Sequence, residues 1–324
     1  MVHTRGPRMG VKLMQEQLEA ARQEKDWYTV QQLYKTLYAR YLHTNQTSEI
    51  GPLLRDGVCT LLDNKEIASG SELALLLIRY LSERRIPPES PYIDYVLEIA
   101  SHYPKGNRHP SKVMFIREAV KWSKAPENRN QGDPLLHAKF ADMFRKDLDY
   151  KAAQAHYLRS HEPQSLASML HEWKELGHPS ERDLFPVRAL LQYLVLGDLS
   201  NARLMFQAYT EGNTDEATWT PLMNFAKLLL QALEQKDLNL FNRLRDEYAK
   251  SIQRDPIFAR YLDEVARVFY GVKKPVTGLG ELVGEFLEMM NTKGAQPGDD
   301  AVYNRGRESG PPDEKLEGIL DLSE

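Results

Sequence analysis

A three-position pattern that recurs along the chain limits the possible folds more than any other feature of this sequence. Each copy has an aspartate, a modest side chain four residues later and an aromatic four residues after that, so all three lie on one face of a helix. The full copies are Asp26, Val30 and Tyr34; Asp149, Ala153 and Tyr157; and Asp198, Ala202 and Phe206. Asp237 and Phe241 form a partial copy, with the aromatic at the middle position.

This unit fits a helix that packs in a pair. The aspartate accepts hydrogen bonds from free N–H groups at the helix start, the modest side chain lets a second helix approach, and the aromatic fills the gap beyond. The later copies are spaced irregularly, by about 40 to 50 residues, which is longer than the tetratricopeptide period of about 34. We therefore expect an all-α protein, a right-handed α-solenoid of degenerate tetratricopeptide-like hairpins in one continuous stack.

The segments between the copies also have helical periodicity, and none alternates long enough for a sheet. The first helix is expected to begin near Val11. Three further helix-start caps are expected at Ser111, at Asp133 with Pro134 in the first helical position, and at Ser180. The expected division is a flexible start at residues 1–10, an N-terminal half at 11–160, a C-terminal half at 161–290 and a disordered tail at 291–324, which is rich in Gly, Pro and charge.

Composition narrows the class of protein further. The net charge of −4 gives no reason to expect general nucleic-acid binding. Cys59 is the only cysteine, so we expect neither an intrachain disulfide nor a structural cysteine-based zinc site, and a reducing compartment is favoured. The longest apolar runs, such as residues 73–78, are too short to cross a bilayer. We expect a cytosolic protein without direct membrane insertion.

No motif specifies an active site. The glycines at 278–284 lack the G-x-G-x-x-G spacing, and the histidines between 156 and 178 do not form H-E-x-x-H. The tyrosines of residues 28–41 interleave with Lys35 and Arg40, which would suit base stacking, but helical spacing turns most of them towards the core. We expect a protein that is not an enzyme and has no cofactor or metal.

A short apolar helix is expected at residues 281–290. Leu282, Phe286 and Met289 lie on one of its faces, and the array behind it has no obvious surface to cover them. Either a partner segment completes this face, or the helix folds back on the helices of residues 222–269.

Several stretches together resemble the Golgi to ER traffic protein 4 family, and the likeness runs over nearly all of residues 11–290. They are KDWYTVQQLYKTLYARYL at 25–42, SGSELALLLIRYL at 69–81, REAVKWS at 117–123, GDPLLHAKFA at 132–141 and RDPIFARYLDEVARVFYGVKKP at 254–275. The last block is the most distinctive.

The resemblance implies a scaffold that holds two partners in the targeting of tail-anchored membrane proteins to the ER. By this likeness, the N-terminal half docks a dimeric targeting ATPase, and the C-terminal half binds a ubiquitin-like-domain protein that recruits a co-chaperone. Tyr28 matches a docking tyrosine, Gln31 stands where many relatives have histidine, and Arg40 falls on a basic position of the same helix. Glu72 stands where relatives have an aspartate that contacts the ATPase. Lys35 joins this ATPase-docking set, and Leu282, Phe286 and Met289 form the expected ubiquitin-like-partner site.

Two other readings remain open at the level of sequence. One is a helical-repeat scaffold subunit of a proteasome-lid-like or signalosome-like assembly. Such a subunit is expected to have a winged-helix module near its C-terminus, and residues 271–324 leave no room for one. The other is an α-helical enzyme, for which polar groups would have to converge in a pocket.

Overall fold

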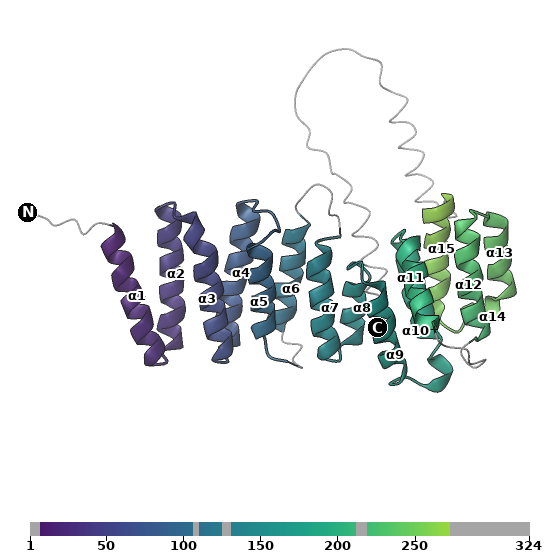
Figure 1. Cartoon of the computed structure of the whole chain (residues 1–324), viewed down its shortest axis with the longest axis horizontal. Helices are drawn as coiled ribbons and strands as arrows, with labels where there is room; N and C mark the ends of the chain where they lie inside the picture. The colour runs from purple at the N-terminus through teal and green to yellow at the C-terminus, as the bar shows by residue number, and fades with distance from the viewer. Residues whose placement is uncertain (1–6, 106–109, 125–130, 212–218, 273–324) are drawn as a thin grey trace, which may run out of the picture. The chain divides into compact units, whose positions relative to one another are not determined.

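The structure is a computed structural model that describes residues 7–105, 110–124, 131–211 and 219–272, and every regular element in these ranges is a helix (Figure 1). The expected all-α fold is confirmed. The described elements, in chain order, are α1 (Pro7–Gln23), α2 (Trp27–His43), η1 (Thr47–Glu49), α3 (Ile50–Asp63), α4 (Ile67–Glu83), α5 (Tyr92–His102), α6 (Pro110–Ser123), α7 (Pro134–Lys146), α8 (Tyr150–Tyr157), α9 (Pro163–Lys174), η2 (Pro179–Glu181), α10 (Leu184–Val195), α11 (Leu199–Thr210), α12 (Pro221–Glu234), α13 (Leu238–Glu247), α14 (Ala249–Ile252) and α15 (Pro256–Tyr270).

The described residues form two compact units, divided between Met169 and Leu170. In the first unit each helix packs on its neighbours in sequence or on the next but one: α1 on α2, α2 on α3, α3 on both α4 and α5, α4 on α6, and α7 on α8. In the second unit α10 packs on α11, α12 and α15, and α12 packs on α13. The predicted division near residue 160 stays a prediction. None of the described helices is long and apolar enough to cross a membrane.

The recurring aspartate pattern does what its spacing predicts. The carboxylates of Asp26, Asp149, Asp198 and Asp237 each accept a hydrogen bond from the backbone N–H three residues later, at 2.9 to 3.3 Å. The modest and aromatic positions of the three full copies, and Phe241 of the partial copy, are all buried. In each copy, the aspartate therefore marks the start of the second helix of a packed pair.

A second feature of these junctions was not expected from the sequence. The residue just before each of these four aspartates has a positive φ: 59° at Lys25, 60° at Leu148, 78° at Gly197 and 53° at Lys236. The aspartate N–H then bonds to the carbonyl five residues back, as Asp198 does to Tyr193 at 3.0 Å. This is the Schellman ending of a helix, and it allows the next helix to begin after a very short connection.

Three local predictions have different outcomes. Asp133 caps α7, with Pro134 in the first turn, as expected. Ser111 and Ser180 are not caps: α6 already begins at Pro110, and the short helix η2 follows His178, whose ring accepts from the N–H of Ser180 at 3.3 Å. The first helix begins at Pro7, before Val11, because proline is well suited to the first helical position.

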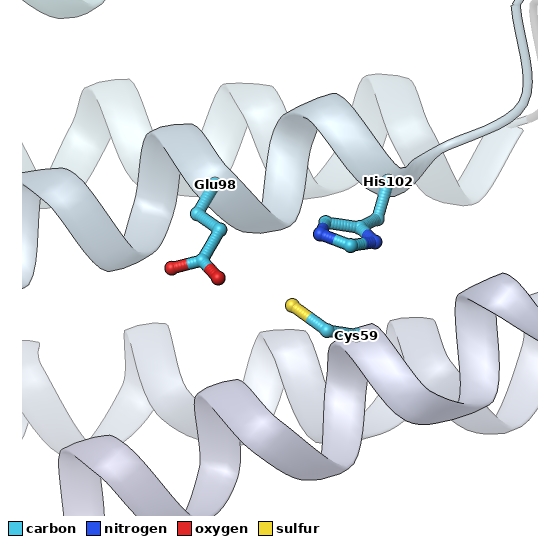
Figure 2. Close-up of side chains that lie close together, drawn as sticks. All are labelled: Cys59, Glu98 and His102. Carbon is cyan, nitrogen blue, oxygen red and sulfur yellow. The ribbon is translucent and has the colours of Figure 1, made fainter.

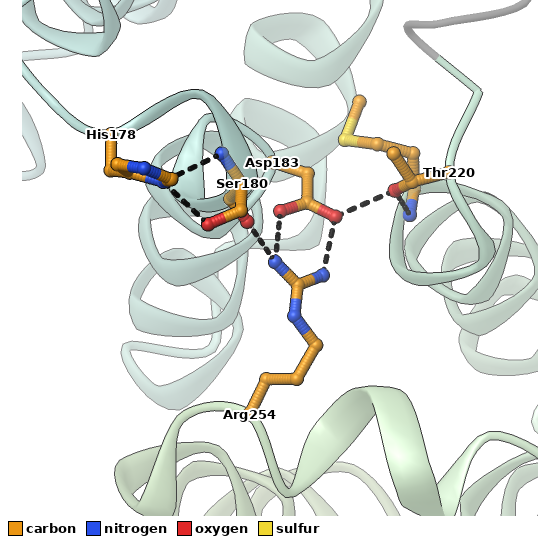
Figure 3. A network of polar contacts seen from close by, with 6 residues as sticks. His178, Ser180, Asp183, Thr220 and Arg254 are labelled. Carbon is orange, nitrogen blue, oxygen red and sulfur yellow. Dashed lines mark hydrogen bonds and ion pairs between the residues drawn. The ribbon is translucent and has the colours of Figure 1, made fainter.

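A polar cluster joins four segments of the second unit (Figure 3). Both carboxylate oxygens of the buried Asp183 accept from the Arg254 guanidinium, at 2.7 and 2.8 Å, and Thr220 Oγ1 donates to the same carboxylate at 2.7 Å. Arg254 also donates to the carbonyl of Ser180. One buried acid thus connects the start of α10, the cap of α12 and the turn before α15.

The next residue adds a second connection between the same helices. Asp255 caps α15 by accepting from the N–H of Ile257 at 3.1 Å, and it accepts from Arg188 of α10 at 2.6 and 3.1 Å. The Arg-Asp pair that opens the most distinctive block of the sequence is therefore structural, because both side chains hold α15 against α10.

Candidate partner-docking surface

The residues expected to dock an ATPase lie on two helices of the first unit. Tyr28, Gln31 and Lys35 follow one another on α2 at spacings of three and four residues, so they form one stripe. Glu72 lies on α4 and faces that stripe. The Asp26 cap sets where α2 begins, which places Tyr28 in the first turn with 72% of its surface exposed.

Glu72 is the centre of the polar contacts on this surface. Its Oε1 accepts from Lys35 Nζ at 2.6 Å, and its Oε2 accepts from Gln31 Nε2 at 2.7 Å. The hydrogen bond from Lys35, assisted by that from Gln31, lowers the pKa of the Glu72 carboxyl, while partial burial opposes the shift. Glu72 is therefore ionised and held in one orientation by two groups of α2.

Gln31 has a different position from the other members of the set. Its side chain is buried, and it also donates to the Ser69 carbonyl at 3.3 Å. Gln31 can therefore influence a partner only by positioning Glu72. The sequence could have indicated that Gln31 is buried, because Gln31 precedes the core residue Tyr34 by three positions and so lies towards the same side of α2.

Arg40 does not join this group. It lies twelve residues beyond Tyr28, which at 3.6 residues per turn turns it to another side of α2. Its guanidinium packs against α1: a Cβ added at Gly10 would lie only 2.7 Å from Arg40 Nη2. The α2–α4 surface therefore consists of Tyr28, Gln31, Lys35 and Glu72, whereas the Arg40 guanidinium lies against α1. The expected docking role of Arg40 stays a prediction.

The expected second site lies outside the described residues. Leu282, Phe286 and Met289 belong to the segment 273–324, as does the tail at 291–324, and both expectations stay predictions.

The α2–α4 surface is suited to binding another protein. An exposed tyrosine offers an apolar ring with a polar tip, which is a frequent anchor in protein interfaces. Lys35 and Glu72 have opposite charges at 2.6 Å, so the surface carries no net charge of its own. Complementarity with a partner therefore depends on the arrangement of these groups more than on an overall charge.

Comparison with known proteins agrees with the fold and covers most of the chain. The sequence model of the Golgi to ER traffic protein 4 family matches residues 44–290. The chain belongs to this family. Its members include Golgi to ER traffic protein 4 homologs of Oryzias latipes, 29% identical over 94% of both chains, and of Dictyostelium discoideum, 31% identical over 87% of this chain and 89% of that protein. The human homolog is 28% identical over 91% of both chains.

A solved structure is also similar. The crystal structure of C. therm. Get4 matches with a TM-score of 0.73 at 21% identity, and the match covers 91% of this chain and all of that one. The likeness shows that the two proteins share the helical-repeat fold. Membership of the Golgi to ER traffic protein 4 family supports a role in ER traffic.

Proposed function

We propose that this chain is a non-enzymatic adaptor in the post-translational targeting of tail-anchored membrane proteins to the ER, acting in the cytosol. The α2–α4 surface docks a targeting ATPase. One observation supports this most directly: the exposed Tyr28 lies on the same stripe of α2 as Lys35, and Gln31 and Lys35 hold Glu72 beside it. A rigid arrangement of this kind costs little entropy when a partner binds.

The same proposal gives the C-terminal half a second partner. A ubiquitin-like-domain protein binds there, Leu282, Phe286 and Met289 contribute apolar contacts, and the co-chaperone is reached through this partner. The support is the sequence pattern of residues 281–290 together with family membership. Two binding surfaces on one helical array are what a bridging function requires.

The ATPase surface is tested by Tyr28→Ala. Removing a central tyrosine from an interface typically costs 2 kcal/mol or more, so we expect affinity for the ATPase to fall by about 30-fold. Leu176→Ala is the matched control, because Leu176 is equally exposed, at 71%. Measured affinities that are the same for Tyr28→Ala and Leu176→Ala would rule out this surface.

Binding of the ATPase should also weaken as the salt concentration increases, and binding that tightens with salt would contradict a polar docking surface.

The second surface is tested by Phe286→Asp. We expect loss of capture of the ubiquitin-like protein while the thermal unfolding of the isolated chain stays unchanged. If Phe286→Asp destabilises the isolated chain as much as it weakens the complex, Phe286 belongs to the core instead.

A further inference from the structure

A group of metal-ligating side chains lies between α3 and α5 and shares no residue with the α2–α4 surface (Figure 2). Cys59 comes from α3, and Glu98 and His102 come from successive turns of α5. A sulfur, a carboxylate oxygen and a ring nitrogen from these three residues all lie within 4.8 Å of one another. Figure 2 shows the Cys59 sulfur directed into the space between the Glu98 carboxylate and the His102 ring. All three residues are half-buried.

The neighbours of this group orient its members. Asp63, one turn beyond Cys59 on α3, has Oδ1 at 2.6 Å from His102 Nδ1. With Nδ1 held by the carboxylate, Nε2 is the ring nitrogen left to bind a ligand. A carboxylate behind a histidine in this way is the usual support of a metal-bound imidazole, since it sets the ring orientation and raises the basicity of the other nitrogen.

The other acid of the group is supported as well. Arg55, one turn before Cys59, has Nη1 at 3.0 Å from both oxygens of Glu98, and its guanidinium lies over the Tyr95 ring, 5.4 Å from the centroid. A stripe of α3 at four-residue spacing, Arg55, Cys59 and Asp63, thus faces the two ligands of α5. Each carboxylate oxygen still has a lone pair available for a cation.

We propose that Cys59, Glu98 and His102 bind a zinc ion, with a water molecule as the fourth ligand and with Asp63 and Arg55 as supporting residues. A sulfur, a nitrogen and an oxygen donor make a set that zinc accepts in tetrahedral geometry, whereas magnesium and calcium prefer oxygen alone. A thiolate and a carboxylate also balance the two positive charges of the ion.

Zinc binding changes the state of the cysteine. In the metal-free chain, burial raises the pKa of the Cys59 thiol to about 11, and the nearby Glu98 carboxylate adds to the shift, so the sulfur carries its proton. When zinc binds, the zinc–sulfur bond forms, the S–H bond breaks, and the proton passes to solvent. The ion then links α3 to α5, two helices that are otherwise joined across this face by side-chain contacts.

The proposal is tested with cobalt(II) added to the chelator-treated full chain, because tetrahedral cobalt with a thiolate ligand has a charge-transfer band in the ultraviolet and intense visible bands. We expect one cobalt ion per chain, displaced by one equivalent of zinc. Cys59→Ser should abolish the charge-transfer band. Asp63→Asn should keep the band and weaken binding by about 10- to 100-fold, as loss of a supporting carboxylate does.

Two controls distinguish this site from non-specific metal binding. His43→Ala removes an exposed histidine of α2 and should change neither stoichiometry nor spectrum. The far-ultraviolet circular dichroism of Cys59→Ser in chelator should match that of the parent, which shows that the variant is folded. Cobalt that binds without a charge-transfer band, or that binds Cys59→Ser as tightly as the parent, would overturn the proposal.

Discussion

At the scale of single residues, the positions just before the capping aspartates are the most informative. Each of the four junctions of the recurring pattern places a residue in the left-handed region, yet only one of them uses glycine, at Gly197. For a residue with a side chain, adopting this conformation costs about 1–2 kcal/mol of conformational energy. Lys25, Leu148 and Lys236 therefore adopt a costly backbone because the Schellman bonds and the packing of the following helix outweigh it.

A pair of substitutions at these positions should have opposite effects. Gly197→Ala should lower the free energy of unfolding by about 1–2 kcal/mol through backbone strain alone, because the added methyl would lie 3.6 Å from Val268, an ordinary contact. Lys236→Gly should raise the free energy of unfolding by up to about 1 kcal/mol, because glycine adopts the left-handed conformation without strain. The greater conformational freedom of glycine in the unfolded chain reduces this gain. Urea unfolding of the two variants measures both. A neutral Gly197→Ala would show that the backbone relaxes out of the left-handed region.

Two histidines of the first unit form another feature of this scale. His137 Nε2 donates to the Gln131 carbonyl at 2.8 Å, so in the neutral ring the unprotonated Nδ1 accepts from His156 Nδ1, 3.0 Å away. The His156 ring also stacks on Phe144, with centroids 5.4 Å apart. Burial lowers the pKa of His156 well below its ordinary value, and the nearby His137 and Arg159 add to the effect.

This shift predicts a loss of stability in mild acid. The folded chain keeps His156 neutral, while the unfolded chain binds a proton as the pH falls below about 6.5. The free energy of unfolding should therefore decrease with falling pH, by up to about 1.4 kcal/mol per pH unit from this residue. His156→Gln retains a donor for His137 and should reduce the slope measured by urea unfolding between about pH 6.5 and 5. The control His43→Gln should keep the slope, and an unchanged slope in His156→Gln would contradict the assignment.

At the scale of elements, α2 and α4 meet through the packing of α2 on α3 and of α3 on α4, as well as through direct contacts. This arrangement brings Lys35 and Gln31 to Glu72, about forty residues further along the chain. The resemblance to the family had already placed these residues in one set, and helical spacing on α2 separates Arg40 from the others. The contacts of Gln31 and Lys35 with Glu72 came from the packing.

Exchanging the two charges separates stability from partner recognition. Lys35→Glu and Glu72→Lys each place like charges together, whereas the double variant restores an attractive pair, and Gln31 can rotate its amide to accept from the new lysine. Because both side chains are partly exposed, we expect a coupling of about 0.2–1 kcal/mol in a double-mutant cycle of unfolding free energies. The double variant should recover stability but not ATPase affinity. Recovery of both would mean that the partner does not distinguish the direction of the pair.

At the scale of the whole molecule, contacts in a helical array are mostly between near neighbours, so a local change should spread only a short distance. The Asp183 cluster offers the clearest case, because it joins α10, α12 and the turn before α15 within the second unit.

Asp183→Ala should therefore loosen one part of the chain. Loss of charge-assisted hydrogen bonds to a half-exposed arginine should lower the free energy of unfolding by about 2–3 kcal/mol. Hydrogen exchange should rise in α10, α12 and α15 and stay unchanged in α1 to α4. Glu175→Ala, which removes an exposed pair with Arg182, is the control and should leave exchange unchanged throughout. An equal rise in both units would show that the array unfolds as a single cooperative body.

The sequence by itself determined the class of fold and the starts of several helices. Capping and helical periodicity act within a few residues, so Asp26, Asp149 and Asp198 and the buried positions that follow them could be identified without any structure. The tertiary structure decided which distant side chains meet: Gln31 with Glu72, His137 with His156, and Cys59 with Glu98 and His102. The reason is that such meetings depend on how each helix is rotated against its neighbour. That rotation results from the packing of many side chains together, which no short stretch of sequence contains.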